Sequence, residues 1–333
     1  MTTPHTMSQT KQLVMHATED GAMWMLHVEA DGRLMVTMPE DMKRCQTRVL
    51  FDEKPVKQVQ DGGQCIFLLT HDGTLFYALR VNSDATPEWR EVKFNMKIKD
   101  LSSRGGPGWV GPAHTRKLVF CTHQGYAGLW QWPFSQHTCK MILHPCPSSV
   151  DQVYMGLQSQ YFLVMTDGSL CRGHTPYDVE LIRKPGWSRV QQLTVFENLP
   201  HVLSQGGNLF VLDGKSKVDS DSLRPITSQG AIHSFSSSNN HAVFLMKDGD
   251  AFTWGNNAFG QCAVPSEAYL NQDVPVKVAS NVLDAACWST GTVLRKSDGL
   301  YYSGRWASTG APLHTVNELM KLTPEIPMEL SDE

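Results

Sequence analysis

The chain has 333 residues, a formal net charge of −4, 41% hydrophobic residues and 19% charged residues. This composition supplies enough apolar side chains for a large folded core. Proteins that neutralise many phosphates carry a basic excess, so the composition argues against direct nucleic-acid binding. No window approaches the roughly 18 consecutive apolar residues of a membrane-spanning helix, so we expect no membrane association.

The cysteines and the first residues indicate where the protein resides. Eight cysteines occur without a C-x-x-C pair, and several lie inside apolar runs such as QCIFLL and LVFCT, which is typical of buried free thiols in a reducing compartment. Residues 1–12 lack the apolar core of a secretory signal and carry one Lys and no acidic residue. We expect a cytoplasmic or nuclear protein in which residues 1–12 form a short N-terminal segment, with a mitochondrial presequence as the alternative.

A hairpin pattern recurs seven times along the chain. Two strand-like apolar runs flank an Asp-Gly, Gln-Gly or Gly-Gly pair, as in MLHVEADGRLMVTM and CIFLLTHDGTLFYAL. Such pairs favour tight turns because glycine adopts positive φ without steric cost. We predict a structural role for the seven turn glycines, which are Gly32, Gly73, Gly125, Gly168, Gly207, Gly249 and Gly299.

The spacing of these hairpins predicts the fold class. Successive turn glycines lie 39 to 52 residues apart, and a repeat of this length is typical of β-propellers, in which each repeat forms one four-stranded blade. A single blade cannot bury both of its faces, whereas seven blades stacked around an axis can. We therefore predict an all-β, seven-bladed β-propeller of four-stranded antiparallel blades as a single domain over residues 13–315.

Further segments predict the remaining strands. A β-like stretch precedes most hairpins, for example PVKQVQ, IKDLSS, DQVYMG and VLDAACWS. Connectors such as TPEWREVKF and DVPVKVAS predict a fourth strand that has Pro near its start, where a missing N–H is tolerated. Residues 316–333 are expected to form a closing segment and tail, in which residues 316–322 are either a short helix or a strand that closes the ring against residues 12–16.

One copy of the hairpin resembles the repeat of the regulator of chromosome condensation family. Residues 241–261 read HAVFLMKDGDAFTWGNNAFGQ, with His, Asp-Gly, an aromatic residue, Trp-Gly, Asn and Gly-Gln in the order of that repeat. The family pattern continues with Leu-Gly, where this chain has Cys262 and Ala263. The seventh copy has Ser303 in place of Trp, and the first five keep mainly the hairpin. The resemblance implies a propeller, and its Trp-Gly, Asn and Gly residues are interpreted as structural.

Three regions outside the hairpin turns carry candidate partner-binding residues. The Gly- and Pro-rich run SSRGGPGWVGPAHTRK is expected to be a long loop, and such loops on a rigid scaffold often carry function. A tolerated insertion is the alternative interpretation. Trp beside Arg is the composition of an interaction hot spot. We predict partner contacts at Arg104, Trp109, Arg116, Trp187, Arg305 and Trp306.

The sequence offers little for catalysis or metal binding. It has no Walker loop, no dinucleotide fingerprint and no G-x-S-x-G motif. The segment HTCKMILHPC holds four residues of metal-ligand type, but their spacing matches no common zinc knuckle. We predict no enzymatic activity, no cofactor and no metal site, with His137, Cys139, His144 and Cys146 as the weak candidates for a metal.

These observations favour a non-enzymatic protein–protein interaction scaffold, acting as a subunit or adaptor of a larger complex. The resemblance implies two alternatives, because the founding member of the family exchanges nucleotide on the GTPase Ran and binds nucleosomes. The first is a guanine-nucleotide exchange factor for a Ran-like small GTPase, although PFSQHT, after Trp132, does not match the β-wedge of that exchange factor. The second is a chromatin-associated propeller, although the expected basic tail is missing.

Overall fold

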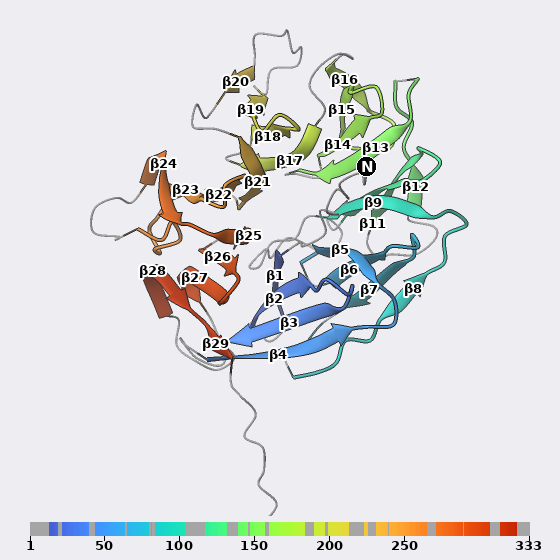
Figure 1. Cartoon of the computed structure of the whole chain (residues 1–333). Helices are drawn as coiled ribbons and strands as arrows, with labels where there is room; N and C mark the ends of the chain where they lie inside the picture. The colour runs from blue at the N-terminus through green and yellow to red at the C-terminus, as the bar shows by residue number, and fades with distance from the viewer. Residues whose placement is uncertain are drawn as a thin grey trace, which may run out of the picture.

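The computed structural model describes the chain as a ring of seven antiparallel β-sheets (Figure 1). It describes residues 13–18, 22–39, 44–63, 65–79, 81, 84–103, 117–131, 139–145, 147–156, 160–183, 190–196, 199–212, 223–225, 231–238, 240–264, 271–288, 290–306 and 314–324. Within these ranges all regular secondary structure is strand, and no helix is long and apolar enough to cross a membrane. The predicted seven-bladed β-propeller is confirmed.

Each of the first four blades is a contiguous piece of chain whose strands pair in order. Blade one contains β1 (Leu13–Ala17), β2 (Met23–Val28), β3 (Leu34–Pro39) and β4 (Arg44–Phe51). Blade two contains β5 (Val56–Asp61), β6 (Cys65–Thr70), β7 (Leu75–Leu79) and β8 (Arg90–Val92). Blade three contains β9 (Ile98–Ser103), β10 (Lys117–Thr122), β11 (Ala127–Gln131) and β12 (Cys139–Met141). Blade four contains β13 (Val150–Met155), β14 (Tyr161–Met165), β15 (Leu170–Gly173) and β16 (Glu180–Arg183).

The last three blades follow the same plan. Blade five contains β17 (Val190–Phe196), β18 (Leu199–Ser204), β19 (Leu209–Leu212) and β20 (Leu223–Pro225). Blade six contains β21 (Ile232–Ser237), β22 (His241–Met246), β23 (Ala251–Asn256) and β24 (Asn271–Ala279). Blade seven contains β25 (Val282–Trp288), β26 (Gly291–Lys296), β27 (Gly299–Trp306) and β28 (His314–Lys321), and β29 (Thr323–Pro324) follows it.

The first strand of each blade lies at the centre of the ring. These inner strands contact one another in sequence, from β1 to β5 and onward to β25, and β25 in turn contacts β1. The contacts therefore form a closed circle, as Figure 1 shows from one end. The predicted strand before each hairpin is this inner strand, and the hairpin itself supplies the second and third strands.

Five of the seven turn glycines form a hydrogen bond with the next blade. All seven have positive φ, between 78° and 139°, so the Asp-Gly and Gly-Gly pairs form the turns for the expected steric reason. The carbonyl of Gly32 accepts a hydrogen bond from Val56 N at 2.8 Å, and Gly249 O accepts one from Val282 N at 2.9 Å. In both cases the donor is the first residue of the next inner strand. The turn thus fixes both a hairpin and the position of the following blade.

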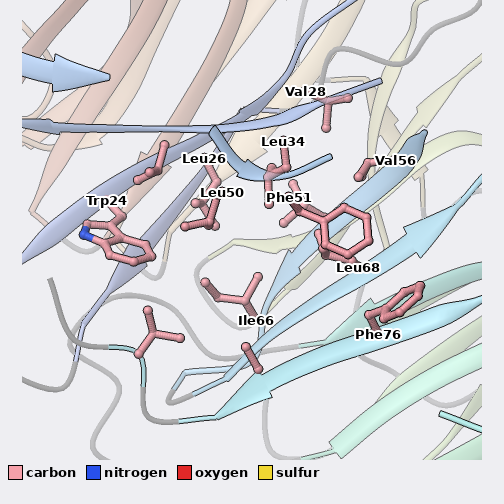
Figure 2. Close-up of a cluster of buried hydrophobic side chains, with 14 residues drawn as sticks. Trp24, Leu26, Val28, Leu34, Leu50, Phe51, Val56, Ile66, Leu68 and Phe76 are labelled. Carbon is pink, nitrogen blue, oxygen red and sulfur yellow. The ribbon is translucent and has the colours of Figure 1, made fainter. Parts of the chain in front are cut away.

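The hydrophobic core lies between neighbouring blades. Every residue of β6 and of β22 is buried, as expected for continuous apolar runs that pack on both faces. Figure 2 shows the cluster between blades one and two, where Leu26 and Leu34 face Ile66 and Leu68. Each fully buried side chain of this size stabilises the fold by about 1.5–3 kcal/mol. The inter-blade clusters therefore stabilise the packing of neighbouring blades.

The ring closes differently from the predicted arrangement. Residues 316–322 form neither a helix nor a strand against residues 12–16, because β28 pairs with β27 as the outer strand of blade seven. Instead β29 pairs in parallel with β4, through Thr323 opposite Arg44 and Pro324 opposite Cys45. β1 is the inner strand of blade one, at the centre of the ring, and β4 is its outer strand. β29 therefore pairs with the outer edge of blade one. The predicted boundary at residues 315 and 316 falls within β28.

Candidate functional site

A ring of bulged residues lines the centre of one face. In each of blades two to seven the inner strand shifts its register after its first residue, so one extra residue is inserted there. Such bulges redirect a side chain and recur beside functional sites. Each bulged residue is the second residue of its inner strand. It therefore lies at the end of the strand that meets the turn glycine of the preceding blade. The bulge ring consists of Lys57, Lys99, Asp151, Gln191, His233 and Leu283.

Side chains of the bulge ring bind the next blade. Lys57 Nζ donates to Lys99 O at 2.5 Å, and Gln191 Nε2 donates to His233 O at 2.5 Å. Lys99 forms an ion pair with Asp151, although both side chains remain partly exposed. The ring is therefore a pre-organised polar surface with basic residues in blades two and three and an acidic one in blade four. Nothing among these residues forms a nucleophile–base pair.

A buried carboxylate lies next to the bulge ring and links blades three and four. Asp100 follows Lys99 on β9, and its Oδ2 accepts a hydrogen bond from Val153 N of blade four at 3.0 Å. Burial raises the pKa of Asp100 to about 6, against the opposing effects of this hydrogen bond and of Lys57. Perturbed carboxylates occur in structural networks as well as in active sites. Here the carboxylate binds a backbone N–H across a blade boundary, which is a structural role.

The motif in blade six forms a structural network. His241 is fully buried, with Nδ1 2.9 Å from Ser238 Oγ and Nε2 3.1 Å from Gly291 O and 3.0 Å from Thr292 Oγ1. Thr292 in turn donates to Gln261 O at 2.8 Å. Burial lowers the pKa of His241 to about 3, so the imidazole is neutral at neutral pH. It joins blade six to blade seven rather than transferring protons.

The loop after the Trp-Gly pair is held by its own side chains. Asn257 Oδ1 accepts from Cys262 N at 2.9 Å, and Asn257 Nδ2 donates to Val264 O at 3.1 Å. Gly255 and Gly260 have φ of 105° and 73°, values that other residues rarely adopt. The structural interpretation of these residues thus has a specific geometric basis, and they offer no surface for chemistry.

The weak metal candidates are only partly described. Cys139 lies on β12 and His144 follows it, whereas His137 and Cys146 lie outside the described residues. Burial raises the pKa of the Cys139 thiol to about 11, so the thiol is protonated at neutral pH when no metal is bound. Within the described ranges no group of three or more His, Cys, Asp or Glu residues could hold a metal ion.

Exposed apolar side chains gather where blades three and four meet. Tyr126, Leu143 and Tyr177 are 59%, 70% and 72% exposed, and Met141 is also exposed. Ile142 N donates to Ala127 O at 2.9 Å, which extends the β11–β12 ladder and sets Leu143 beside Tyr126. Leu143 N donates to Pro176 O at 3.0 Å, which brings the loop that carries Tyr177 against blade three. We call Tyr126, Met141, Leu143 and Tyr177 the blade three–four rim.

The loop that carries Tyr177 is held in place. Asp178 accepts hydrogen bonds from the backbone N–H groups of His174 at 3.0 Å and Thr175 at 2.6 Å. These bonds help to hold the pKa of Asp178 below its usual value, although partial burial has the opposite effect. Thr175 O accepts from Tyr161 Oη at 2.7 Å, and Lys117 Nζ of blade three donates to His174 O at 3.3 Å. Tyr177 is therefore displayed by a loop with little freedom to rearrange.

Two family models match the chain. Both describe the regulator of chromosome condensation (RCC1) repeat, one at residues 232–261 and the other at residues 248–294. Together they span the chain from β21 to β26 and contain the motif of blade six. The protein is a seven-bladed propeller whose blades six and seven carry RCC1-type repeats. None of the curated proteins compared with it is significantly similar in sequence.

Solved structures share the fold of this propeller at low sequence identity. Prp20p from Saccharomyces cerevisiae is 12% identical with a TM-score of 0.56, over 80% of this chain and 79% of that chain. Human WBSCR16 is 15% identical with a TM-score of 0.55, over 79% of this chain and 82% of that chain. YCF48 from Cyanidioschyzon merolae is 10% identical with a TM-score of 0.57, over 88% of this chain and 94% of that chain. These similarities concern the fold alone.

Most of the predicted partner-binding residues lie outside the described structure. Arg104, Trp109, Arg116 and Trp187 lie outside the described residues, and of Trp306 only the backbone is described, paired with His314. Arg305 is half-buried, and its guanidinium lies 5.3 Å from the centre of the Phe259 ring. This side chain thus contacts blade six within the molecule. Its role in binding a partner stays a prediction.

Sequence reasoning missed the two surfaces that the structure does describe. The bulge ring has a signal in retrospect, because the inner strands begin with an aliphatic residue, a variable residue and then Gln, Asp or Ser, as in VKQ, IKD and VQQ. The second residue of each triplet is the bulged one. The blade three–four rim has no such signal, since Tyr126 and Leu143 lie in apolar patterns that equally fit buried positions.

Proposed function

We propose that the protein is a non-enzymatic protein–protein interaction module, acting as a subunit or adaptor of a larger complex, and that it binds a partner through the blade three–four rim. The observation that carries this proposal is the exposure of Tyr126, Leu143 and Tyr177 on adjoining segments of two blades. Contiguous exposed apolar side chains mark interaction sites. Tyr is enriched among the residues that dominate binding energy.

The rigidity of the rim supports the same proposal. The loop of Tyr177 is fixed by hydrogen bonds through Asp178 and Tyr161, and Leu143 continues a strand. A surface that is already ordered loses little conformational entropy on association. The cysteines within the described residues are free and mostly buried, which supports placing this interaction in a reducing compartment, such as the cytoplasm or nucleus.

A rim variant tests the proposal. We expect Leu143→Asp with Tyr177→Asp to abolish capture of the partner, because two desolvated carboxylates would have no counter-charge in an apolar interface. The melting temperature should stay within about 2 °C of the wild type, since exposed substitutions rarely change stability by more than about 0.5 kcal/mol. Affinity purification with mass spectrometry and a thermal unfolding scan provide the two measurements.

The matched control is Val274→Asp, which changes an equally apolar side chain, 70% exposed, on β24 of blade six. It should retain every partner that the wild type captures. If the control and the rim variant lose the same partners, or if neither loses any, the rim is not the binding surface. If the rim variant unfolds, its side chains belong to the core of the ring.

Nucleotide exchange on a Ran-like GTPase is the second candidate function. It is favoured by the RCC1 repeats of blades six and seven and by the fold shared with Prp20p, a protein reported to bind Gsp1p and histones. The bulge ring would then offer the charged surface that meets the GTPase. Release of a fluorescent GDP from the GTPase, with and without the protein, distinguishes the two functions, because only exchange accelerates release. Chromatin association has less support, since the net charge is −4.

A further inference from the structure

We propose that the boundary between blades seven and one, where the chain closes the ring, is a pH-sensitive release point at which His27 faces Arg295. His27 lies on β2 two residues after Met25, which packs against blade seven. Arg295 lies on β26 two residues after Val293, which packs in the same cluster. Because side chains alternate between the two faces of a strand, both basic residues point into the boundary.

The other six boundaries are apolar at the equivalent position. Arg295 is the fourth residue before the turn glycine of its blade, and His27 is the fifth residue before that of the next blade. At every other boundary the residues at these two positions are buried, apolar and part of one cluster. The six pairs are Val28 with Leu68, Leu69 with Phe120, Cys121 with Leu163, Val164 with Val202, Leu203 with Phe244, and Leu245 with Leu294. Blades seven and one place two basic side chains there instead, and burying them costs desolvation energy.

Both basic side chains are largely removed from solvent and only partly hydrogen-bonded. The side chain of His27 is 13% exposed and that of Arg295 is 18% exposed. Arg295 Nη2 lies 3.9 Å from Asp284 Oδ2, and neither Nη2 nor Nε of Arg295 has a hydrogen-bond partner within the described residues. His27 Nε2 lies 3.2 Å from Glu29 Oε1, and it carries the ring hydrogen because a carboxylate only accepts. His27 Nδ1 is therefore the unprotonated nitrogen, and it is buried without a partner in the same part of the chain.

Acidification adds a proton to His27 Nδ1. The new N–H is then buried, and a second positive charge lies beside Arg295. Burial lowers the pKa of His27, and Arg295 lowers it further, while the Glu29 carboxylate and the Met25 carbonyl act in the opposite direction. Protonation therefore works against the closed boundary, because burial penalises the charged imidazole.

The remaining groups around His27 do not offset this charge. The strands β1 and β3 place apolar residues opposite His27. Asp31 and Arg33 of the following turn pair with each other at 2.7 Å. On the turn of blade seven, Asp298 pairs with Lys321 at 2.8 Å. Between neutral and mildly acidic pH, the charge of this boundary therefore changes at His27.

The direction of the pH effect follows from the lowered pKa of His27. A solvent-exposed histidine has a pKa of 6.5, so His27 binds its proton more readily when the blades separate than when they are closed. The boundary is held fully above pH 6.5 and weakens as the pH falls through the lower pKa of the closed state. The other six boundaries have no histidine at this position, so the weakening is local to blades seven and one.

Oxidation of buried methionines by hydrogen peroxide measures the opening of single boundaries. Met25 is fully buried two residues from His27, whereas Met165 is buried between blades three and four. Peptide mass spectrometry of the full-length protein gives the ratio of their initial oxidation rates, in which the pH dependence of the reagent cancels. We expect the ratio of Met25 to Met165 to rise at least about threefold between pH 7.5 and pH 5. A ratio that does not rise would overturn the proposal.

Two variants assign the response to His27. His27→Leu supplies the residue type that Leu294 provides at the equivalent position of blade seven, and it leaves Arg295 beside Asp284. Its oxidation ratio should be the same at both pH values, and a rise equal to that of the wild type would refute the role of His27. Glu29→Gln changes a side chain that is 47% exposed and removes the carboxylate that favours the imidazolium. It should fold normally and enlarge the rise, whereas a smaller rise would contradict the proposed charge balance.

Discussion

Replacing His241 with Gln is expected to lower the free energy of unfolding at neutral pH by about 2–3 kcal/mol, because it breaks hydrogen bonds in a fully buried network. The wild-type imidazole binds Ser238, Gly291 and Thr292, and so connects blade six to blade seven. An amide side chain cannot place two polar atoms at the positions of both ring nitrogens. Unfolding in denaturant at pH 7 measures the loss.

The same variant should change how stability depends on pH. Burial lowers the pKa of His241 from 6.5 to about 3 in the folded state, so the unfolded chain binds its proton first as the pH falls. The stabilisation is complete above pH 6.5 and is lost progressively down to about pH 3. At about 1.4 kcal/mol per pH unit, the total loss is roughly 4–5 kcal/mol. The advantage of the wild type should therefore shrink on acidification, vanish at roughly pH 4.5–5 and then reverse, because Gln does not titrate.

Contributions from other carboxylates and histidines cancel in this difference, which makes the comparison specific. A difference that stays constant between pH 7 and pH 4 would show that His241 titrates alike in the folded and unfolded chains. It would also remove the physical basis for interpreting the blade six histidine as a neutral structural group.

The hairpins could be predicted from the sequence because their causes are local. The Asp-Gly turn at residues 248 and 249 requires positive φ, and the continuous apolar run of residues 242–246 is a strand buried on both faces. Both features depend only on neighbouring residues. Their regular recurrence then indicates stacking, and five of the seven turn glycines accept a hydrogen bond from the first residue of the next inner strand.

Ring closure and the candidate surfaces depend on residues that are distant in sequence. The β29–β4 pairing joins Thr323 to Arg44 through a two-residue strand, too short for periodicity to reveal. Leu143 is exposed because the chain runs beside Pro176 there. Tyr126 is exposed because no other segment covers it within the described residues. Apolar residues in strand-like runs are buried by default. An exposed one is recognised only when its neighbours in space are known.

Replacing Gly207 with Ala is expected to destabilise the protein by about 3 kcal/mol, while the same change at the adjacent Gly206 should be nearly neutral. Gly207 has φ of 82°, where a Cβ costs about 1–2 kcal/mol. That Cβ would also lie 2.8 Å from Ala231 Cα. Relieving this clash would require Ala231 to move. The next residue, Ile232, donates its N–H to Gly207 O at 2.9 Å, so the movement would disturb that hydrogen bond. The turn and the joint between blades five and six would be strained together.

Gly206 is a matched control within the same turn. Its φ lies outside the left-handed region, and a Cβ there would meet nothing closer than Asn208 Nδ2 at 3.5 Å. Ala at this position restricts the unfolded chain and should change stability by less than about 1 kcal/mol, in the stabilising direction. Urea unfolding of the two variants gives the comparison. Equal losses would mean that the turn tolerates no Cβ at either position, and equal stability would mean that Gly207 does not link the two blades.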